Sequence, residues 1–263
     1  PPPDWTVDLT LSGVDIAKPV EGRMLTDMDG SLTVTPDQAV LKADALVDGA
    51  RMTLDVLQPV GGSAVKAARE LSGTLSPEAR EKMAPGTGEL ISGPVGFVLT
   101  AGADGGQTVN LDLKPAKLTV PGIGWTKDKG VAASLRFTMQ TEGSETRLTD
   151  LKLSGDGFSA SGAVTLADGR LSAASFDQVS LSPRDDYRVQ LSRNGKSYQI
   201  KLDGKAIDAR PIIALAKSSG SGQAKGGEGA SIEVTGTVDT VHGYSDERLS
   251  SASVSYKGQG SRI

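Results

Sequence analysis

Ser63 and Lys66 have a spacing that could support chemistry, because some acylating hydrolases activate a serine with a lysine three residues later. In those enzymes the pair works together with Ser-Asp-Asn and Lys-Thr-Gly motifs. Neither motif follows in this chain, and a serine three residues before a lysine is common by chance. We therefore predict no acyl-transfer site at this position.

His242 is the only histidine, and the chain has no cysteine. This composition excludes a thiolate metal site, a disulfide and a cluster of histidines. His242 stands beside Gly243 in the segment TVHGYSDE, which is typical of a loop. We predict a loop residue here, and neither a metal nor any other cofactor.

The segment Asp27–Ser31 reads DMDGS and resembles half of a calcium-binding loop. The complete motif needs an aspartate at position 25 and a glutamate at position 36, where this chain has Leu25 and Pro36. A hairpin turn at Asp29-Gly30 explains the residues better, because Gly and Asp tolerate the positive φ of tight turns.

Two further enzyme signals are equally weak. The chain has 32 acidic residues, but no pair of carboxylates stands out for glycoside chemistry. The segment GSGQAKGGEG is flanked by small polar residues rather than by a strand and a helix, which favours a linker over a phosphate cradle. We therefore predict that the chain is not an enzyme.

The net charge and the hydropathy of the chain limit the kinds of partner that we predict. The net charge is −4, with 28 basic residues that are scattered along the chain, so we predict no nucleic-acid partner. No apolar run approaches the roughly 20 residues that a membrane-spanning helix needs. The chain begins with three prolines and no methionine, and we interpret it as a piece of a longer protein.

The elements that must position any functional residue are β-strands. Apolar residues alternate with polar ones in many short runs, as in antiparallel strands with one buried face. The clearest runs are Val7–Leu11, Met52–Val56, Val95–Leu99, Val109–Leu113, Leu135–Met139, Tyr187–Leu191, Tyr198–Leu202 and Ala252–Tyr256.

Glycine pairs predict the turns between these strands. Asp-Gly occurs at 29–30, 48–49, 104–105, 156–157, 168–169 and 203–204, and Asn-Gly at 194–195. The strongest hairpin signal joins the runs 187–191 and 198–202 through Asn194-Gly195.

Helix signals are few. Ser76 is a candidate N-cap with Pro77 at the first helical position, and Pro85-Gly86 would end that helix. A second short helix is predicted within residues 208–218, starting near Pro211.

These signals divide the chain into three parts. Residues 1–217 form the main β region, with the short helix near 76–85. Residues 218–231 are a Gly/Ser-rich linker or loop. Residues 232–263 either begin a further β unit or return to pair with the first sheet.

Four segments resemble one another, each with a basic residue followed by apolar and hydroxyl residues. They begin at Arg23, Arg147, Arg170 and Arg248. A genuine internal repeat would favour a sheet that grows by the addition of strands. The alternative is that β-rich segments built from few residue types resemble one another without a genuine repeat.

Strands with one apolar face must bury that face. Two sheets can close on each other as a β-sandwich. Alternatively, one long, highly twisted antiparallel sheet curls into an open apolar groove that a ligand such as an acyl chain covers. The aromatic content of 4% favours the groove, because an aliphatic lining leaves room for a chain. We predict a mainly β protein with an open groove, and the closed sandwich is the alternative.

Several segments together resemble the AsmA-like proteins of Gram-negative bacteria, a TamB-related group, and in particular their YhdP-like central region. They are TGELISGPVGFVLTAG (87–102), LKPAKLTVPGIGWTKDKG (113–130), LSGDGFSASGAVTLADGRL (153–171), KLDGKAIDARPIIALAK (201–217) and the segment IEVTGTVDTVHGYSDERLSSASVSY that follows. Their order is a stronger argument than any one of them. Pro121–Trp125 is the most distinctive element.

The resemblance implies a β-groove protein of the periplasm, part of a parent chain anchored in the inner membrane, that carries phospholipid toward the outer membrane. Its partners would be phospholipid acyl chains, the rest of the same long chain and envelope proteins. The inward residues that we predict to line the groove are Leu9, Leu11, Leu54, Val56, Phe97, Leu99, Leu111, Leu113, Leu135, Phe137, Phe158, Val164, Val189, Leu191, Ile200 and Leu202. Aspartate at Phe158 or Leu111 is expected to abolish lipid loading.

A second function class stays open at this point. A non-catalytic scaffold for envelope assembly would have the same composition and would bind protein partners through an apolar surface or an edge strand.

Overall fold

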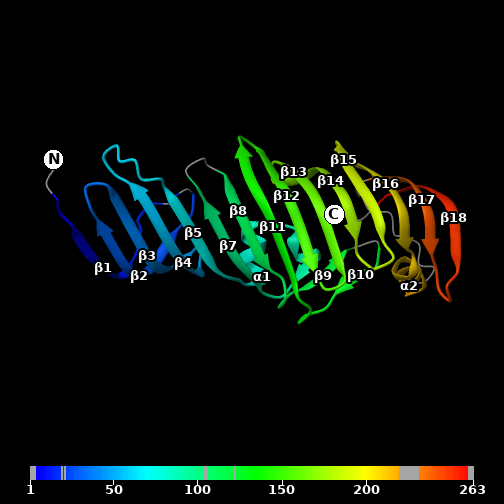
Figure 1. Ribbon diagram of the computed structural model, residues 1–263, viewed down its shortest axis with the longest axis horizontal. Coiled ribbons are helices and arrows are strands. Elements are labelled where there is room, and N and C mark those ends of the chain that lie inside the picture. Colours follow the sequence, from blue (N-terminus) through cyan, green and yellow to red (C-terminus); the bar gives the residue numbers. More distant parts are fainter. Residues whose placement is uncertain are drawn as a thin grey trace.

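The computed structural model describes residues 4–18, 20, 22–102, 106–120, 123–218 and 231–259. One sheet of fifteen strands forms most of the molecule, and its strands lie side by side along the long axis from β1 to β18 (Figure 1). In sheet order they are β1 (Val7–Val14), β2 (Leu25–Val34), β3 (Gln38–Val47), β4 (Ala50–Pro59), β5 (Ala68–Leu75), β7 (Val95–Ala101), β8 (Gln107–Asp112), β11 (Ala133–Glu142), β12 (Glu145–Gly155), β13 (Phe158–Ala167), β14 (Arg170–Ser180), β15 (Asp186–Asn194), β16 (Ser197–Asp208), β17 (Ser231–His242) and β18 (Arg248–Gln259).

The predicted fold class is confirmed. The protein is mainly β, and its large sheet is curled into an open groove rather than closed into a barrel or paired with a second large sheet. Neighbouring strands are antiparallel with one exception, because β16 and β17 run parallel. Parallel neighbours need a crossover connection, and this one contains helix α2 (Arg210–Ser218).

A smaller layer lies against the large sheet. It contains helix α1 (Pro77–Met83), the 3₁₀ turn η1 (Thr87–Glu89) and a three-stranded sheet of β6 (Ile91–Ser92), β9 (Lys117–Val120) and β10 (Trp125–Lys127). We call these elements the covering layer. The segments that form this layer follow β5 and β8 in the chain, and both of these strands end at the same long edge of the large sheet. We call this edge the covered edge. The opposite long edge, with the turns at 35–37, 143–144 and 195–196, is the rim.

The strongest local predictions are confirmed. β15 and β16 form the expected hairpin, with Asn194 paired to Ser197, so the two central turn residues are Gly195 and Lys196. Gly195 has φ +61°, as a tight hairpin turn requires. The Ser76 side chain accepts a hydrogen bond from the Ala79 backbone N–H at 3.2 Å and caps α1.

Two predicted turns are wrong. Asp29-Gly30 lies inside β2, and Asp203-Gly204 lies inside β16. Both glycines stand where a neighbouring strand comes too close for a side chain. A Cβ atom on Gly30 would meet the Lys42 carbonyl oxygen at 2.1 Å, and one on Gly204 would meet the Tyr187 Cβ at 2.4 Å. The predicted Asp-Gly turn at 104–105 lies outside the described residues, as does 219–230, nearly all of the predicted linker.

Three of the four similar arginine-led segments share a backbone feature. In each, a residue two positions after a leucine has positive φ, namely Asp27 (50°), Asp150 (53°) and Ser251 (56°). At Asp27 and Asp150 the pairing with the next strand also shifts, as in a β-bulge. A bulge bends its strand and increases the local twist, so the repeated pattern helps to curl the sheet.

Candidate functional site

The strand register places the predicted lining residues on one face of the large sheet, apart from Leu113, which follows the last residue of β8 and has no pair in the register. Residues that pair directly across strands point to the same face, and successive residues of a strand point to opposite faces. Leu54 pairs with Leu71, which in turn pairs with Leu99, and Phe97 pairs with Leu111. We call this side the apolar face.

One row on this face crosses the entire sheet with a direct partner on every strand. We call it the long row. It consists of Leu9, Leu32, Leu41, Val56, Arg69, Ala101, Gln107, Met139, Leu148, Val164, Ala174, Leu191, Ile200, Val234 and Tyr256. Apart from Arg69 and Gln107, these side chains are aliphatic or aromatic, or, at Met139, a thioether.

The long row is only partly shielded from solvent. Leu148, Val164, Leu191 and Ile200 are partly exposed, although each has apolar neighbours on both adjacent strands. At the two ends of the sheet the exposed fraction rises to 46% for Leu9 and 57% for Tyr256. From Met139 on β11 to Val234 on β17 the row is an uninterrupted, partly exposed apolar surface, which suits a long apolar ligand better than a polar substrate.

Nearer the covered edge, the apolar face is packed against the covering layer. Phe158, Leu113 and Val95 share a buried cluster with Leu118 of β9. The Phe158 ring meets the Trp125 ring edge-on, with centroids 5.0 Å apart. Along the same edge, Met83 and Ala79 of α1 pack against a second cluster that includes Phe97 and Met52.

This packing separates the predicted lining residues into three groups. Leu54, Phe97, Leu113 and Phe158 are at most 9% exposed, so they have little surface to offer a ligand. Leu11, Leu99, Leu111, Leu135, Phe137, Val189 and Leu202 are partly buried beside the clusters. Leu9, Val56, Val164, Leu191 and Ile200 belong to the long row.

Two buried cations fasten the covering layer, and sequence alternation gave no sign of either. The Arg80 guanidinium, on α1, donates to the carbonyl oxygens of Gly93 at 2.7 Å and Ile91 at 2.6 Å. The Lys127 ammonium donates to the carbonyls of Leu113 and Ala116. Burial lowers the pKa of Lys127 from its ordinary value. Both cations are only a few per cent exposed, so their role is structural.

A third polar group fixes α2 beside the sheet. The Arg210 guanidinium forms an ion pair with Asp208, whose side chain is 3% exposed. Hydrogen bonding from Arg210 holds the pKa of Asp208 below its ordinary value. The Asp208 backbone N–H in turn donates to the Asp185 carboxylate at 2.7 Å, and burial raises the pKa of Asp185.

The prediction that His242 lies in a loop is wrong. His242 is the last residue of β17 and pairs with Asp208 on one side and Arg248 on the other. Its carbonyl accepts from the Ala209 N–H, while its buried Nδ1 atom has no hydrogen-bond partner. The backbone of His242 pairs with both neighbouring strands, and its residue type gives no indication of this pairing.

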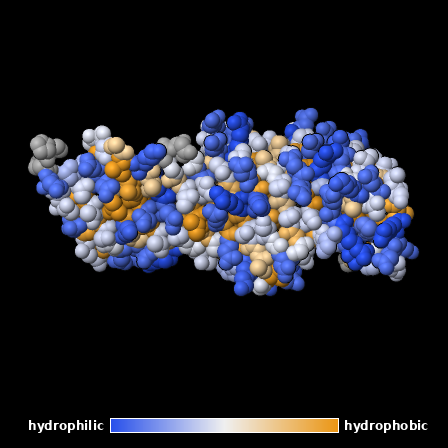
Figure 2. Space-filling model, viewed as in Figure 1, coloured by the Kyte–Doolittle hydropathy of each residue, from blue (hydrophilic) through white to orange (hydrophobic). Residues whose placement is uncertain are grey.

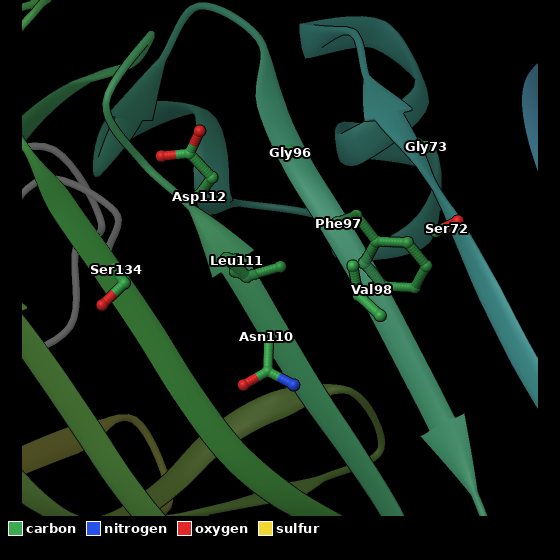
Figure 3. Close-up of a pocket in the computed structure, with 9 residues that line it drawn as sticks. All are labelled: Ser72, Gly73, Gly96, Phe97, Val98, Asn110, Leu111, Asp112 and Ser134. Atoms are coloured by element: carbon green, nitrogen blue, oxygen red, sulfur yellow. The ribbon is translucent and has the colours of Figure 1, made fainter.

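The opposite face of the sheet is polar, and it carries cross-strand pairs such as Lys42–Asp55 and Thr237–Asp203. A shallow hollow of about 430 Å³ lies there, where Gly96 has no side chain (Figure 3). Its polar lining includes Asn110, Asp112 and Ser134. One carboxylate among amide and hydroxyl groups offers no acid–base pair.

Other site types find no support among the residues that the structure describes. No group of three or more His, Asp or Glu side chains could hold a metal ion there. Neither helix in that part of the chain is long and apolar enough to cross a bilayer. In the space-filling view, hydrophobic side chains form separate patches among hydrophilic ones (Figure 2).

We compared the chain with protein-family models, curated proteins and solved structures, and none matches. The functional argument therefore rests on the sheet and its apolar face.

Proposed function

We propose that the apolar face holds phospholipid acyl chains, and that the chain is a segment of a bridge-like periplasmic protein that passes phospholipid between the inner and outer membranes. The long row carries this proposal, because it offers partly exposed apolar side chains on every strand of an open sheet except β5 and β8. The sequence resemblance to AsmA-like proteins supports the periplasmic location and the transfer of phospholipid toward the outer membrane.

The binding energy comes from hydrocarbon alone. Moving one CH₂ group from water onto an apolar surface contributes about 0.8 kcal/mol. Leu148, Val164 and Leu191 present hydrocarbon of similar size, so an acyl chain loses little when it leaves one and reaches the next. Many equivalent weak contacts let a chain bind and still move along the row.

The length of the row suits several lipids. Fifteen strands spaced about 4.8 Å apart give a path of about 67 Å. The acyl chains of one bilayer leaflet extend about 15 Å, half of a 30 Å hydrocarbon core. Several lipids can therefore lie one after another.

The covering layer gives the groove one closed side. Arg80 and Lys127 fasten this layer to the sheet, and Phe158 and Trp125 fill the space beneath it. The acyl chain lies between this layer and the rim, and its headgroup faces solvent at the rim.

A second candidate function is a scaffold that binds protein partners, and the edge strand β18 favours it. Leu249, Val254 and Tyr256 are 67%, 54% and 57% exposed on a strand with one free side in the sheet order. An extended segment of a partner protein, or of the same long chain, can pair with such an edge.

Photolabelling tests the proposal. Vesicles that contain a phospholipid with a diazirine in its acyl chain are incubated with the chain and illuminated, and the labelled residues are mapped by mass spectrometry. We expect labels at long-row residues such as Leu148, Leu191 and Ile200, where a water-soluble diazirine places few. Labels confined to β18 would favour the scaffold and contradict acyl-chain binding along the row.

A further inference from the structure

The last two strands of the sheet repeat the first two in sequence and in pairing. Val14 on β1 corresponds to Val238 on β17 at an offset of 224 residues, and each valine is followed by an aspartate. Val14 pairs with Met28 across the first hairpin. At the same offset, Val238 pairs with Ala252 across the last one.

The connections within the two hairpins match as well. In the first, the Arg23 N–H donates to the Val20 carbonyl at 2.9 Å. In the last, at the same offset of 224 residues, the Glu247 N–H donates to the Tyr244 carbonyl at 3.0 Å. The match therefore includes the backbone between the strands.

Positive φ angles recur at the same offset. Gly22 and Asp246 have φ of 78° and 59°, and Asp27 and Ser251 have φ of 50° and 56°. A positive φ is uncommon for a residue other than glycine, so its recurrence at Asp27 and Ser251 indicates related structures. We infer that β17 and β18 are the structural counterparts of β1 and β2.

The two counterparts differ in what lies beside them. Leu25 on β2 is 8% exposed and pairs with Val47 of β3, whereas its counterpart Leu249 on β18 is 67% exposed. Leu32, which also lies beside β3, is partly buried, and its counterpart Tyr256 is 57% exposed. Among the described residues, β18 has a paired strand on one side only. Its exposed side chains are those that β3 would border on β2.

The backbone of β18 already has the conformation that accompanies a bulge. At Asp27 on β2 and at Asp150 on β12, two residues oppose one residue of the next strand, as in a β-bulge. Ser251 has a similar φ, yet the pairing of β18 with β17 keeps one register throughout. The conformation at Ser251 therefore fits a strand on the other side of β18.

One position of β18 sets how closely such a strand can approach. Val254 stands where β2 has Gly30, and β3 passes Gly30 too closely for a side chain. The similar segment on β12 has Leu153 at the corresponding position, where it pairs with Ala160 of β13. A strand can therefore lie beside an apolar side chain here if its own residue is small.

We propose that the free edge of β18 receives one antiparallel strand of the β3 type, supplied by another part of the same long protein. This inference rests on the proposal that the chain is a segment of a longer protein, and it does not depend on acyl-chain binding. The repeat favours this source, because in the first hairpin the partner strand belongs to the same chain. An exposed edge strand can receive an extended segment in this way.

The register of β3 on β2 specifies the new pairing. An aliphatic residue of the added strand lies opposite Leu249, a second lies opposite Tyr256, and a small residue lies beside Val254. Residues that pair directly across strands share a face, so the added strand continues the long row beyond Tyr256.

A peptide with the sequence of residues 36–48, which contains β3, is the probe. One version carries a photoreactive leucine analogue in place of Leu41, and another carries it in place of Val47. Each is incubated with the full chain and illuminated, and the labelled residues are mapped by mass spectrometry. We expect labels near Tyr256 from the first version and near Leu249 from the second. The reverse order, labels outside β18 or no label would overturn the proposal.

A matched peptide tests the bulge. One serine is inserted between Asp44 and Ala45, so two peptide residues oppose two residues of β18, and the side chains beyond the insertion turn to the opposite face. We expect labelling of β18 to fall at least ten-fold, because Val47 then leaves the apolar face. Labelling as strong as that of the original peptide would contradict the role of Ser251.

The remaining outcomes separate this proposal from its alternatives. A chain that forms dimers or larger assemblies through β18 and takes no peptide would overturn it in favour of a second copy at this edge. Failure of the peptide to bind leaves acyl-chain binding standing. A chain that takes the peptide on β18 but retains no lipid supports the added strand and contradicts acyl-chain binding alone.

Discussion

Replacing Leu191 by aspartate is expected to reduce the phospholipid recovered with the chain at least ten-fold while the sheet stays folded. Leu191 lies in the long row, is partly exposed and pairs with Ala174 and Ile200. A carboxylate there must lose water when an acyl chain covers it, which costs several kcal/mol. A loss of 1.4 kcal/mol already lowers affinity ten-fold.

The adjacent residue provides the control. Gln190 on the same strand points to the polar face and pairs with Lys201. Gln190→Asp adds the same charge to the same strand and should leave lipid recovery unchanged. Circular dichroism and thermal melting establish that both variants are folded. Equal lipid recovery from the two variants would contradict acyl-chain binding along this row.

Phe158→Ala is expected to lower the free energy of unfolding by about 3–5 kcal/mol. Phe158 is 8% exposed and packs in one cluster with Leu113 and Leu118, beneath the Trp125 ring. Truncation removes this contact and leaves a cavity between the large sheet and the covering layer. Urea unfolding followed by tryptophan fluorescence measures the change.

Ser159→Ala is the matched control for this second prediction. Ser159 follows Phe158 on β13 and, by the alternation of the strand, points to the polar face. We expect a change within about 0.5 kcal/mol. A loss below about 1 kcal/mol in Phe158→Ala would show that the covering layer is not packed on the sheet as described.

Leu191 and Phe158 also show how much of the site can be predicted from the sequence. Alternation identified both as inward-facing, because a strand fixes the face of every second side chain. It could not distinguish the buried Phe158 from the partly exposed Leu191, since that difference depends on which other segment covers the strand. Phe158, chosen from sequence for a lipid-loading variant, tests stability instead.

The missed features depend on contacts between distant parts of the chain. Arg80 and Lys127 carry no periodic signal, and their roles arise from carbonyl groups that the fold brings to them. Gly30 and Gly204 resemble turn residues, yet they are needed where two strands approach closely.

Lipid retention by the unmodified chain is the most direct measurement of the central claim. The chain is purified without detergent from a Gram-negative host, and native mass spectrometry is combined with lipid extraction. We predict chain masses with one or more added phospholipids, which collisional activation removes. A single lipid-free mass, with no phospholipid in the extract and a cooperative melt that added lipid does not shift, would contradict the account.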